Sequence, residues 1–215
     1  MMNPLMVKVY FRLRKGWKRL NKDAQQQARQ YLLSQRRARG YLNAGGQVDD
    51  YYTQFGKVVE AVIWPLKVLR LPRKPLVVKE SMGRDTIYGR FFDFLSGGKP
   101  QTSDLKPQTS TAACCVLAMQ HQTGEARDTA LISWLKARQD QTGGFYASEV
   151  APVPDLLSTA VALFTLRLIG IRPQSASQFI EAHWIDMGSF SPTVLDEYSD
   201  VEYLFYGLLA LGSDE

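Results

Sequence analysis

The stretch from Trp134 to Gly170, WLKARQDQTGGFYASEVAPVPDLLSTAVALFTLRLIG, predicts two helices joined by a long turn. Gly143 and Gly144 follow a polar run and end the first helix, because glycine is unfavourable inside a helix. Asp155 precedes an apolar run, and its carboxylate suits the N-cap of the second helix. The stretch is therefore a predicted helical hairpin.

The same order recurs 45 residues further along the chain. Between Phe179 and Gly212 an aromatic limb, a Gly-Ser-Phe turn and Asp200 precede a second apolar limb. The offsets from Trp134 to Phe179 and from Asp155 to Asp200 are both 45 residues. A fixed spacing of this size indicates an array of helical hairpins.

Two earlier copies of the hairpin complete the predicted array. One has Gly45 and Gly46 in its turn and Asp50 at the opening of its second limb. A fainter copy follows a basic, proline-containing linker over residues 65–84. We expect one repeat domain over residues 23–215, with hairpins at about 24–64, 82–123, 126–170 and 174–212.

These repeats resemble a known family. A Gln-ending outer helix, a Gly-Gly-Phe turn, and an aspartate before an inner helix ending in Leu-Gly resemble the α/α-toroid repeats of protein prenyltransferase β subunits and terpenoid (squalene-type) cyclases. The resemblance covers roughly residues 24–212 and is strongest over the last two hairpins. It implies an all-α, toroid-like partial ring of about four hairpins. It also implies an isoprenoid- or lipid-related protein that acts with a partner chain, although a fold alone does not assign a reaction.

In such a ring the second limbs line the inside, so their aromatic side chains would surround a central cavity. Aromatic walls suit a long apolar ligand such as an isoprenoid. Packing within the core is the alternative role for the same side chains. The candidate ligand-binding residues are Tyr51, Tyr52, Phe55, Phe164, Tyr203, Phe205 and Tyr206.

The zinc ligands of the resembling prenyltransferases are not retained. That family carries Asp-x-Cys and Asp-x-Tyr-His at the inner-helix openings, and here Leu157 and Tyr203 occupy the Cys and His positions. A catalytic zinc ion normally needs three protein ligands. His121 and His183 are the two histidines of the chain, and their spacing is not that of a metal site. We therefore predict neither zinc nor another cofactor.

Residues 47–50, Gln-Val-Asp-Asp, keep the last two acids of the Asp-x-Asp-Asp motif with which class II cyclases protonate an alkene or epoxide. Paired carboxyls can hold a proton at a raised pKa. Alternatively, the pair caps the helix and charges its first turn. For a prenyltransferase-like or cyclase-like enzyme, the candidate catalytic residues are Asp49, Asp50, Asp155, Asp200 and Glu202. A non-catalytic interaction scaffold that kept the repeat and lost the ligands is the alternative function.

Residues 1–22 are predicted to form a basic amphipathic helix in front of the array. Gly16 is expected to interrupt this helix. An anionic membrane surface could meet the helix over residues 5–22. Packing of the apolar stripe on the array is the alternative. The apolar stripe consists of Met6, Val9, Tyr10, Leu13, Trp17 and Leu20, and the basic face of Lys8, Arg12, Lys15, Arg19 and Lys22.

The charge of the chain is divided along its length. Residues 1–90 carry 19 Lys and Arg against 6 Asp and Glu, a net +13, whereas the remainder carries 7 against 15, a net −8. This division indicates an anionic partner, or attraction between the halves or between two copies of the chain. A nucleic-acid partner is not expected, because no recognisable motif accompanies the charge.

The location expected for the protein is cytoplasmic, with peripheral contact at a membrane surface. No apolar stretch is long enough to span a membrane, no secretory signal is recognisable, and the adjacent Cys114 and Cys115 suit reduced, buried thiols. An open array would leave apolar edges on its first and last hairpins. We expect the N-terminal helix to cover one edge, and a partner chain or second copy to cover the other.

Overall fold

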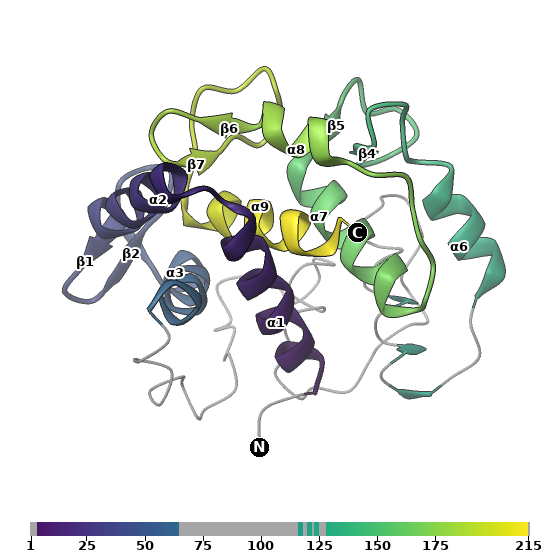
Figure 1. Ribbon diagram of the computed structural model, residues 1–215, viewed down its shortest axis with the longest axis horizontal. Helices are drawn as coiled ribbons and strands as arrows, with labels where there is room; N and C mark the ends of the chain where they lie inside the picture. The colour runs from purple at the N-terminus through teal and green to yellow at the C-terminus, as the bar shows by residue number, and fades with distance from the viewer. Residues whose placement is uncertain (1–3, 65–115, 118–119, 122, 125–127, 215) are drawn as a thin grey trace.

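The computed structural model describes residues 4–64, 116–117, 120–121, 123–124 and 128–214. Within these ranges the chain is mainly helical, with small antiparallel sheets of two or three short strands between the helices (Figure 1). The predicted linker over residues 65–84, most of the hairpin predicted over residues 82–123, and both cysteines lie outside the described residues.

The described chain begins with helix α1 (Pro4–Arg19) and continues with three helical hairpins. The first consists of α2 (Lys22–Gln35), β1 (Arg36–Arg37), β2 (Gly40–Leu42), β3 (Val48–Asp49) and α3 (Asp50–Ile63). The next described hairpin consists of α6 (Thr129–Lys136), β4 (Phe145–Tyr146), β5 (Pro154–Asp155) and α7 (Leu156–Leu168). The last consists of α8 (Ser177–Ala182), β6 (Trp184–Ile185), β7 (Ser189–Phe190) and α9 (Val201–Ser213).

Strand pairs occupy the segments that the sequence predicts as turns. Tyr41 pairs with Asp49, Phe145 with Asp155, and Trp184 with Phe190, each in antiparallel register. Strands of two or three residues are too short to produce a recognisable alternation of polar and apolar residues. Helix α6 also ends earlier than predicted, at Lys136, well before Gly143.

An aromatic residue of each strand pair is buried against its own inner helix. The rings of Tyr41 and Phe190 lie where side chains at Gly56 and Gly207 would otherwise project. Phe145 is also fully buried, and its N–H donates to the hydroxyl of Thr159 on α7 over 2.8 Å. Phe190 thus packs on a small residue of its own inner helix.

The inner helices lie side by side, with α9 between α3 and α7 (Figure 1). The first hairpin therefore packs directly on the last one. On the outer side, the turn between β6 and β7 approaches α2 so closely that a side chain at Gly188 would overlap the backbone of Gln27. On this face the first and last hairpins therefore cover one another.

Helix α1 crosses α9 at a pair of glycines. A side chain at Gly16 would overlap the carbonyl oxygen of Leu208, and one at Gly212 would overlap that of Arg12. The prediction that Gly16 interrupts this helix is therefore wrong. Gly16 lies inside α1 and lets the backbones of α1 and α9 approach closely. Of the predicted stripe, Val9, Leu13 and Trp17 are buried in the common core, as the packing alternative predicts. Leu5 is buried beside them, whereas Met6, Tyr10 and Leu20 are half-buried against it.

Part of the basic face of α1 binds the C-terminal end of α9. The guanidinium of Arg19 donates to the carbonyl oxygens of Leu211 and Asp214 over 2.8 and 2.7 Å, and Arg12 donates to Gly212 over 3.2 Å. The last carbonyls of a helix lack partners within it and carry partial negative charge, so arginines stabilise this end.

Candidate functional site

The inner helices open at three aspartates that act as N-caps. The Asp49 carboxylate accepts hydrogen bonds from the N–H groups of Tyr51 and Tyr52 over 2.8 and 3.3 Å. Asp155 accepts from Ser158 over 2.7 Å. These bonds satisfy free N–H groups of the first turn, so each aspartate has a clear role in stabilising its helix.

Asp200 repeats this geometry on α9. Its carboxylate accepts from the N–H groups of Glu202 and Tyr203 over 2.9 and 3.1 Å. Burial raises the pKa of Asp200 above its ordinary value, although these two hydrogen bonds act in the opposite direction. Burial likewise raises the pKa of Asp155, against the hydrogen bonds from Ser158. The predicted catalytic aspartates Asp155 and Asp200 are thus helix caps in a poorly solvated environment.

The carboxyl pair at residues 49 and 50 is not a buried acid pair. Asp49 is the N-cap of α3, whereas Asp50 is exposed on the first turn of that helix. The alternative in which this pair serves helix capping is therefore the one observed. An acid that must keep its proton needs burial or a close like charge. The hypothesis of cyclase-like chemistry at Asp49 and Asp50 has no such support from this geometry.

Glu202 has the environment that Asp50 lacks. It lies on the first turn of α9 and is only 8% exposed. The hydroxyl of Tyr51, on α3, donates to its Oε1 over 2.5 Å. Burial raises the pKa of Glu202 to about 7; the Tyr51 hydrogen bond opposes this rise and the charge of Asp200 adds to it. Glu202 is thus a buried carboxyl that exchanges its proton near neutral pH.

Aromatic rings surround this carboxyl. Phe55 packs edge-to-face against Tyr51 and Phe205, with ring centroids 4.8 and 5.0 Å apart, and lies 5.7 Å from the ring of Tyr206. Phe55, Phe205 and Tyr206 are buried, whereas Tyr51 is half-buried. Tyr52 lies beside Tyr51. Five of the predicted ligand-wall residues thus form one cluster between α3 and α9: Tyr51, Tyr52, Phe55, Phe205 and Tyr206.

The outer part of this cluster is formed by two half-buried tyrosines. Burial raises the pKa of Tyr203, and the charges of Glu202 and Asp200 raise it further. Burial also raises the pKa of Tyr52, and the charges of the same two carboxyls raise it further. We call Tyr51, Tyr52, Asp200, Glu202 and Tyr203 the carboxyl–tyrosine cluster. Phe164, the remaining predicted ligand-wall residue on another inner helix, is buried on α7.

Tyr198 is a neighbour of the cluster that sequence reasoning did not select. It lies in the loop before α9, where the charges of Asp196 and Asp200 add to burial in raising its pKa. Its only sequence signal is its place two residues before the capping aspartate Asp200. Many loop residues share such a position, so it does not identify Tyr198 as a site residue.

The described residues provide no metal centre. Within the described ranges, no three His, Cys, Asp or Glu side chains are grouped so that they could hold a metal ion. Leu157 and Tyr203, at the family's Cys and His positions, are both half-buried next to helix caps. The two histidines do not converge, since His121 faces Lys8 across 3.1 Å, whereas His183 is fully buried beside Phe179.

His183 is held as a neutral ring. Its Nδ1 lies 2.7 Å from the carbonyl oxygen of Phe179, which makes Nδ1 the protonated nitrogen, and its Nε2 has no hydrogen-bond partner in the structure. Burial lowers the pKa of His183, against the effect of the Phe179 carbonyl. The residue therefore belongs to the packing of α8 rather than to the carboxyl–tyrosine cluster.

None of the helices in the described ranges combines the length and the apolar character needed to cross a bilayer. The chain matches no protein-family model, no curated protein and no solved structure. The geometry of the carboxyl–tyrosine cluster is therefore the basis for a functional proposal.

Proposed function

We propose that this protein binds a long, neutral apolar ligand, an isoprenoid or a related lipid, at the carboxyl–tyrosine cluster. The proposal includes a toroid-like arrangement of the hairpins, as in prenyltransferase β subunits, and a partner chain that acts with this one. The observation that supports it best is Glu202, a buried carboxyl among aromatic rings that two different hairpins supply.

The surrounding charges favour a neutral ligand over a prenyl diphosphate. The half-buried Tyr52 and Tyr203 lie in the field of Asp200 and Glu202, and Asp49 and Asp155 stand at the neighbouring helix openings. A diphosphate would meet these carboxylates at close range, where like charges repel. Protonated Glu202 could instead donate a hydrogen bond to an alcohol or carbonyl oxygen, while tyrosine rings cover the hydrocarbon.

The test is equilibrium binding of fluorescent farnesol and farnesyl diphosphate analogues, together with mass spectrometry of lipid that co-purifies with the protein. We expect saturable binding of the alcohol, weaker binding of the diphosphate, and a loss of about tenfold in affinity for the alcohol in Tyr52→Ala and Tyr203→Ala. Tyr146→Ala is the matched control, because Tyr146 is a half-buried tyrosine on β4.

The absence of both co-purified lipid and saturable binding would reject this proposal. The remaining candidate would then be a non-catalytic interaction scaffold. Two observations favour that second function: Asp49, Asp155 and Asp200 are engaged as helix caps, and the rings of Phe55 and Phe205 pack directly on each other.

If the protein is an enzyme, its acid is Glu202 rather than the pair at residues 49 and 50. A general acid works best when its pKa is close to the working pH, and Glu202 meets this condition. A reaction that needs this proton would be lost in Glu202→Gln, whereas Asp50→Asn, at an exposed position, would leave its rate almost unchanged.

A further inference from the structure

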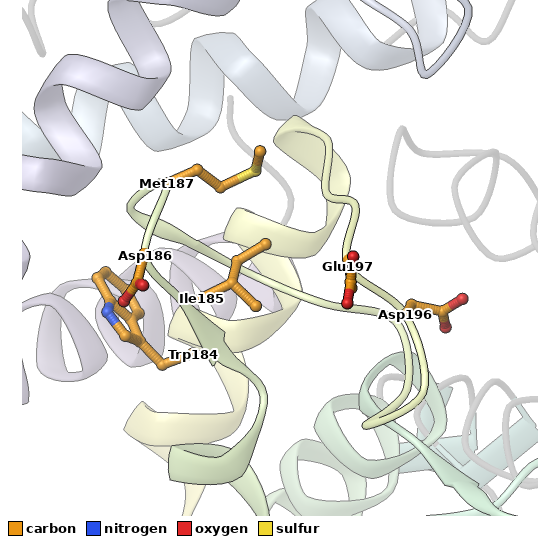
Figure 2. Close-up of a pocket in the computed structure, with 6 residues that line it drawn as sticks. All are labelled: Trp184, Ile185, Asp186, Met187, Asp196 and Glu197. Atoms are coloured by element: carbon orange, nitrogen blue, oxygen red, sulfur yellow. The ribbon is translucent and has the colours of Figure 1, made fainter.

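The turn between β6 and β7 borders a hollow on the outer side of the last hairpin. It has a volume of about 400 Å³, and Figure 2 shows the side chain of Ile185 between the turn that carries Asp186 and Met187 and the loop that carries Asp196 and Glu197. Trp184 completes the lining, which thus contains three carboxylates, three apolar side chains and no base.

Exposed apolar side chains flank this hollow. Met187 is 49% exposed, Val194 55% and Leu195 77%. Single exposed apolar residues are ordinary, but several in one short segment beside a hollow are typical of a binding surface. We call Asp186, Met187, Val194, Leu195 and Glu197, together with the hollow, the β6–β7 surface.

The repeat presents an apolar residue at the same position in the neighbouring hairpin. Val150 precedes Leu195 by 45 residues, and both lie five residues before the aspartate that caps the inner helix. Val150 is 90% exposed. Core packing does not explain an apolar side chain that two repeats keep in solvent. Loops that project from one edge of a repeat array often form its binding face.

The loop that carries Leu195 is held rigidly. The Asp196 carboxylate accepts from both the N–H and the hydroxyl of Thr193, over 3.0 and 2.7 Å. The N–H of Leu156 donates to the carbonyl oxygen of Pro192 over 2.9 Å, which ties the loop to α7. A preformed surface loses little conformational entropy when a partner binds to it. The exposure of Leu195 is therefore a fixed feature of the fold.

From the charge and shape of this surface we propose that it binds a basic amphipathic helix of a partner protein. Leucine-like side chains of that helix would cover Leu195 and Val194, and its Lys or Arg side chains would meet Asp186 and Glu197. Opposite charges at the edge of an apolar contact favour the correct partner and speed its association. The proposal is independent of the isoprenoid proposal, because the β6–β7 surface shares no residue with the carboxyl–tyrosine cluster.

Two other occupants fit the surface less well. Among the described residues, the basic amphipathic helix that a second copy of this chain could offer is α1, and its apolar stripe already packs against α9. An anionic membrane would be repelled by Asp186 and Glu197. A separate protein with a free basic helix therefore remains the occupant that matches both the apolar and the acidic parts.

The probe is a fluorescein-labelled helical peptide with leucines on one face and lysines on the other. Its control is a scrambled peptide of the same composition, so that only the amphipathic arrangement differs. We expect saturable binding of the amphipathic peptide by fluorescence anisotropy, and affinities lower by about tenfold in Leu195→Ser and in Glu197→Lys. Both positions are exposed, so these variants should fold.

Matched control variants are Leu33→Ser and Glu181→Lys, which change exposed residues on α2 and α8. Equal binding of the two peptides would overturn the proposal, as would equal losses in the test and control variants. A third outcome would also overturn it: sedimentation detects a dimer, Leu195→Ser dissociates that dimer, and the peptide does not bind to the dimer. Farnesol binding should be unchanged in Leu195→Ser, which separates this result from the failure of the ligand proposal.

Discussion

At the scale of single residues, Glu202 is the most unusual group of the described chain. A carboxyl that is 8% exposed and bonded to Tyr51 costs folding free energy whenever it is charged. The folded protein therefore holds this proton up to a pH of about 7, whereas an unfolded chain releases it near 4.5. Between these values the folded state binds more protons, so stability must fall as the pH rises.

Glu202→Gln tests this directly. We expect the variant to match the wild type near pH 4, below the pKa of the unfolded chain, and to be more stable at pH 8 by up to roughly 3 kcal/mol, because the amide never becomes charged. Urea unfolding measured across this pH range gives both free energies. Glu181→Gln, at an exposed position on α8, should change neither. A parallel loss of stability with pH in wild type and Glu202→Gln would show that Glu202 is not the titrating group.

At the scale of elements, the crossing of α1 over α9 depends on two glycines. Alanine at Gly212 would strengthen the isolated helix by about 1 kcal/mol, yet its methyl group would overlap the carbonyl oxygen of Arg12. Backbone atoms cannot move aside as a flexible side chain can. We therefore expect Gly212→Ala to lose about 2–4 kcal/mol of unfolding free energy in urea. Lys18→Ala, on the exposed face of α1, should lose almost none.

The same crossing limits how α1 could bind a membrane. Its apolar stripe is buried, so the face left for a lipid surface is basic and carries one large exposed apolar residue, Phe11, at 64% exposure. We expect any binding to anionic vesicles at low salt, measured by co-sedimentation, to be electrostatic. Such binding should be abolished at about 0.5 M salt. Binding that resists this salt concentration would indicate that α1 leaves α9 and inserts its stripe.

At the scale of the whole molecule, the first and last hairpins meet through α3 and α9 and also at the β6–β7 turn, which lies against α2. Gly188 and Gly46 both have positive φ angles, +88° and +75°. Alanine strains the backbone at either site by about 1 kcal/mol, but only at Gly188 would its methyl group also meet the backbone of Gln27. Thermal unfolding should therefore show a clearly larger loss for Gly188→Ala than for Gly46→Ala. Equal losses would indicate that the two hairpins are not tightly joined there.

Local features of this fold could be read from the sequence, because they depend on neighbours along the chain. The capping aspartates Asp155 and Asp200 were predicted from their place before apolar runs, and the structure confirms both as N-caps. The limits of α3, between the aspartates and Pro65, follow from the same local signals. The strand pairs could not be predicted in this way, because a strand of two residues shows no recognisable alternation of polar and apolar residues.

The relative placement of these elements was decided only by tertiary packing. Nothing in the local sequence of α9 indicates that Glu202 meets Tyr51, which is 151 residues away. The close crossing at Gly16 was interpreted as a helix break, because a glycine in sequence does not reveal whether another backbone approaches it. A repeat specifies its own hairpin through short-range capping and periodicity. Which hairpin lies beside which depends on burial of apolar area over the whole chain, and that sum is available only once the chain has folded.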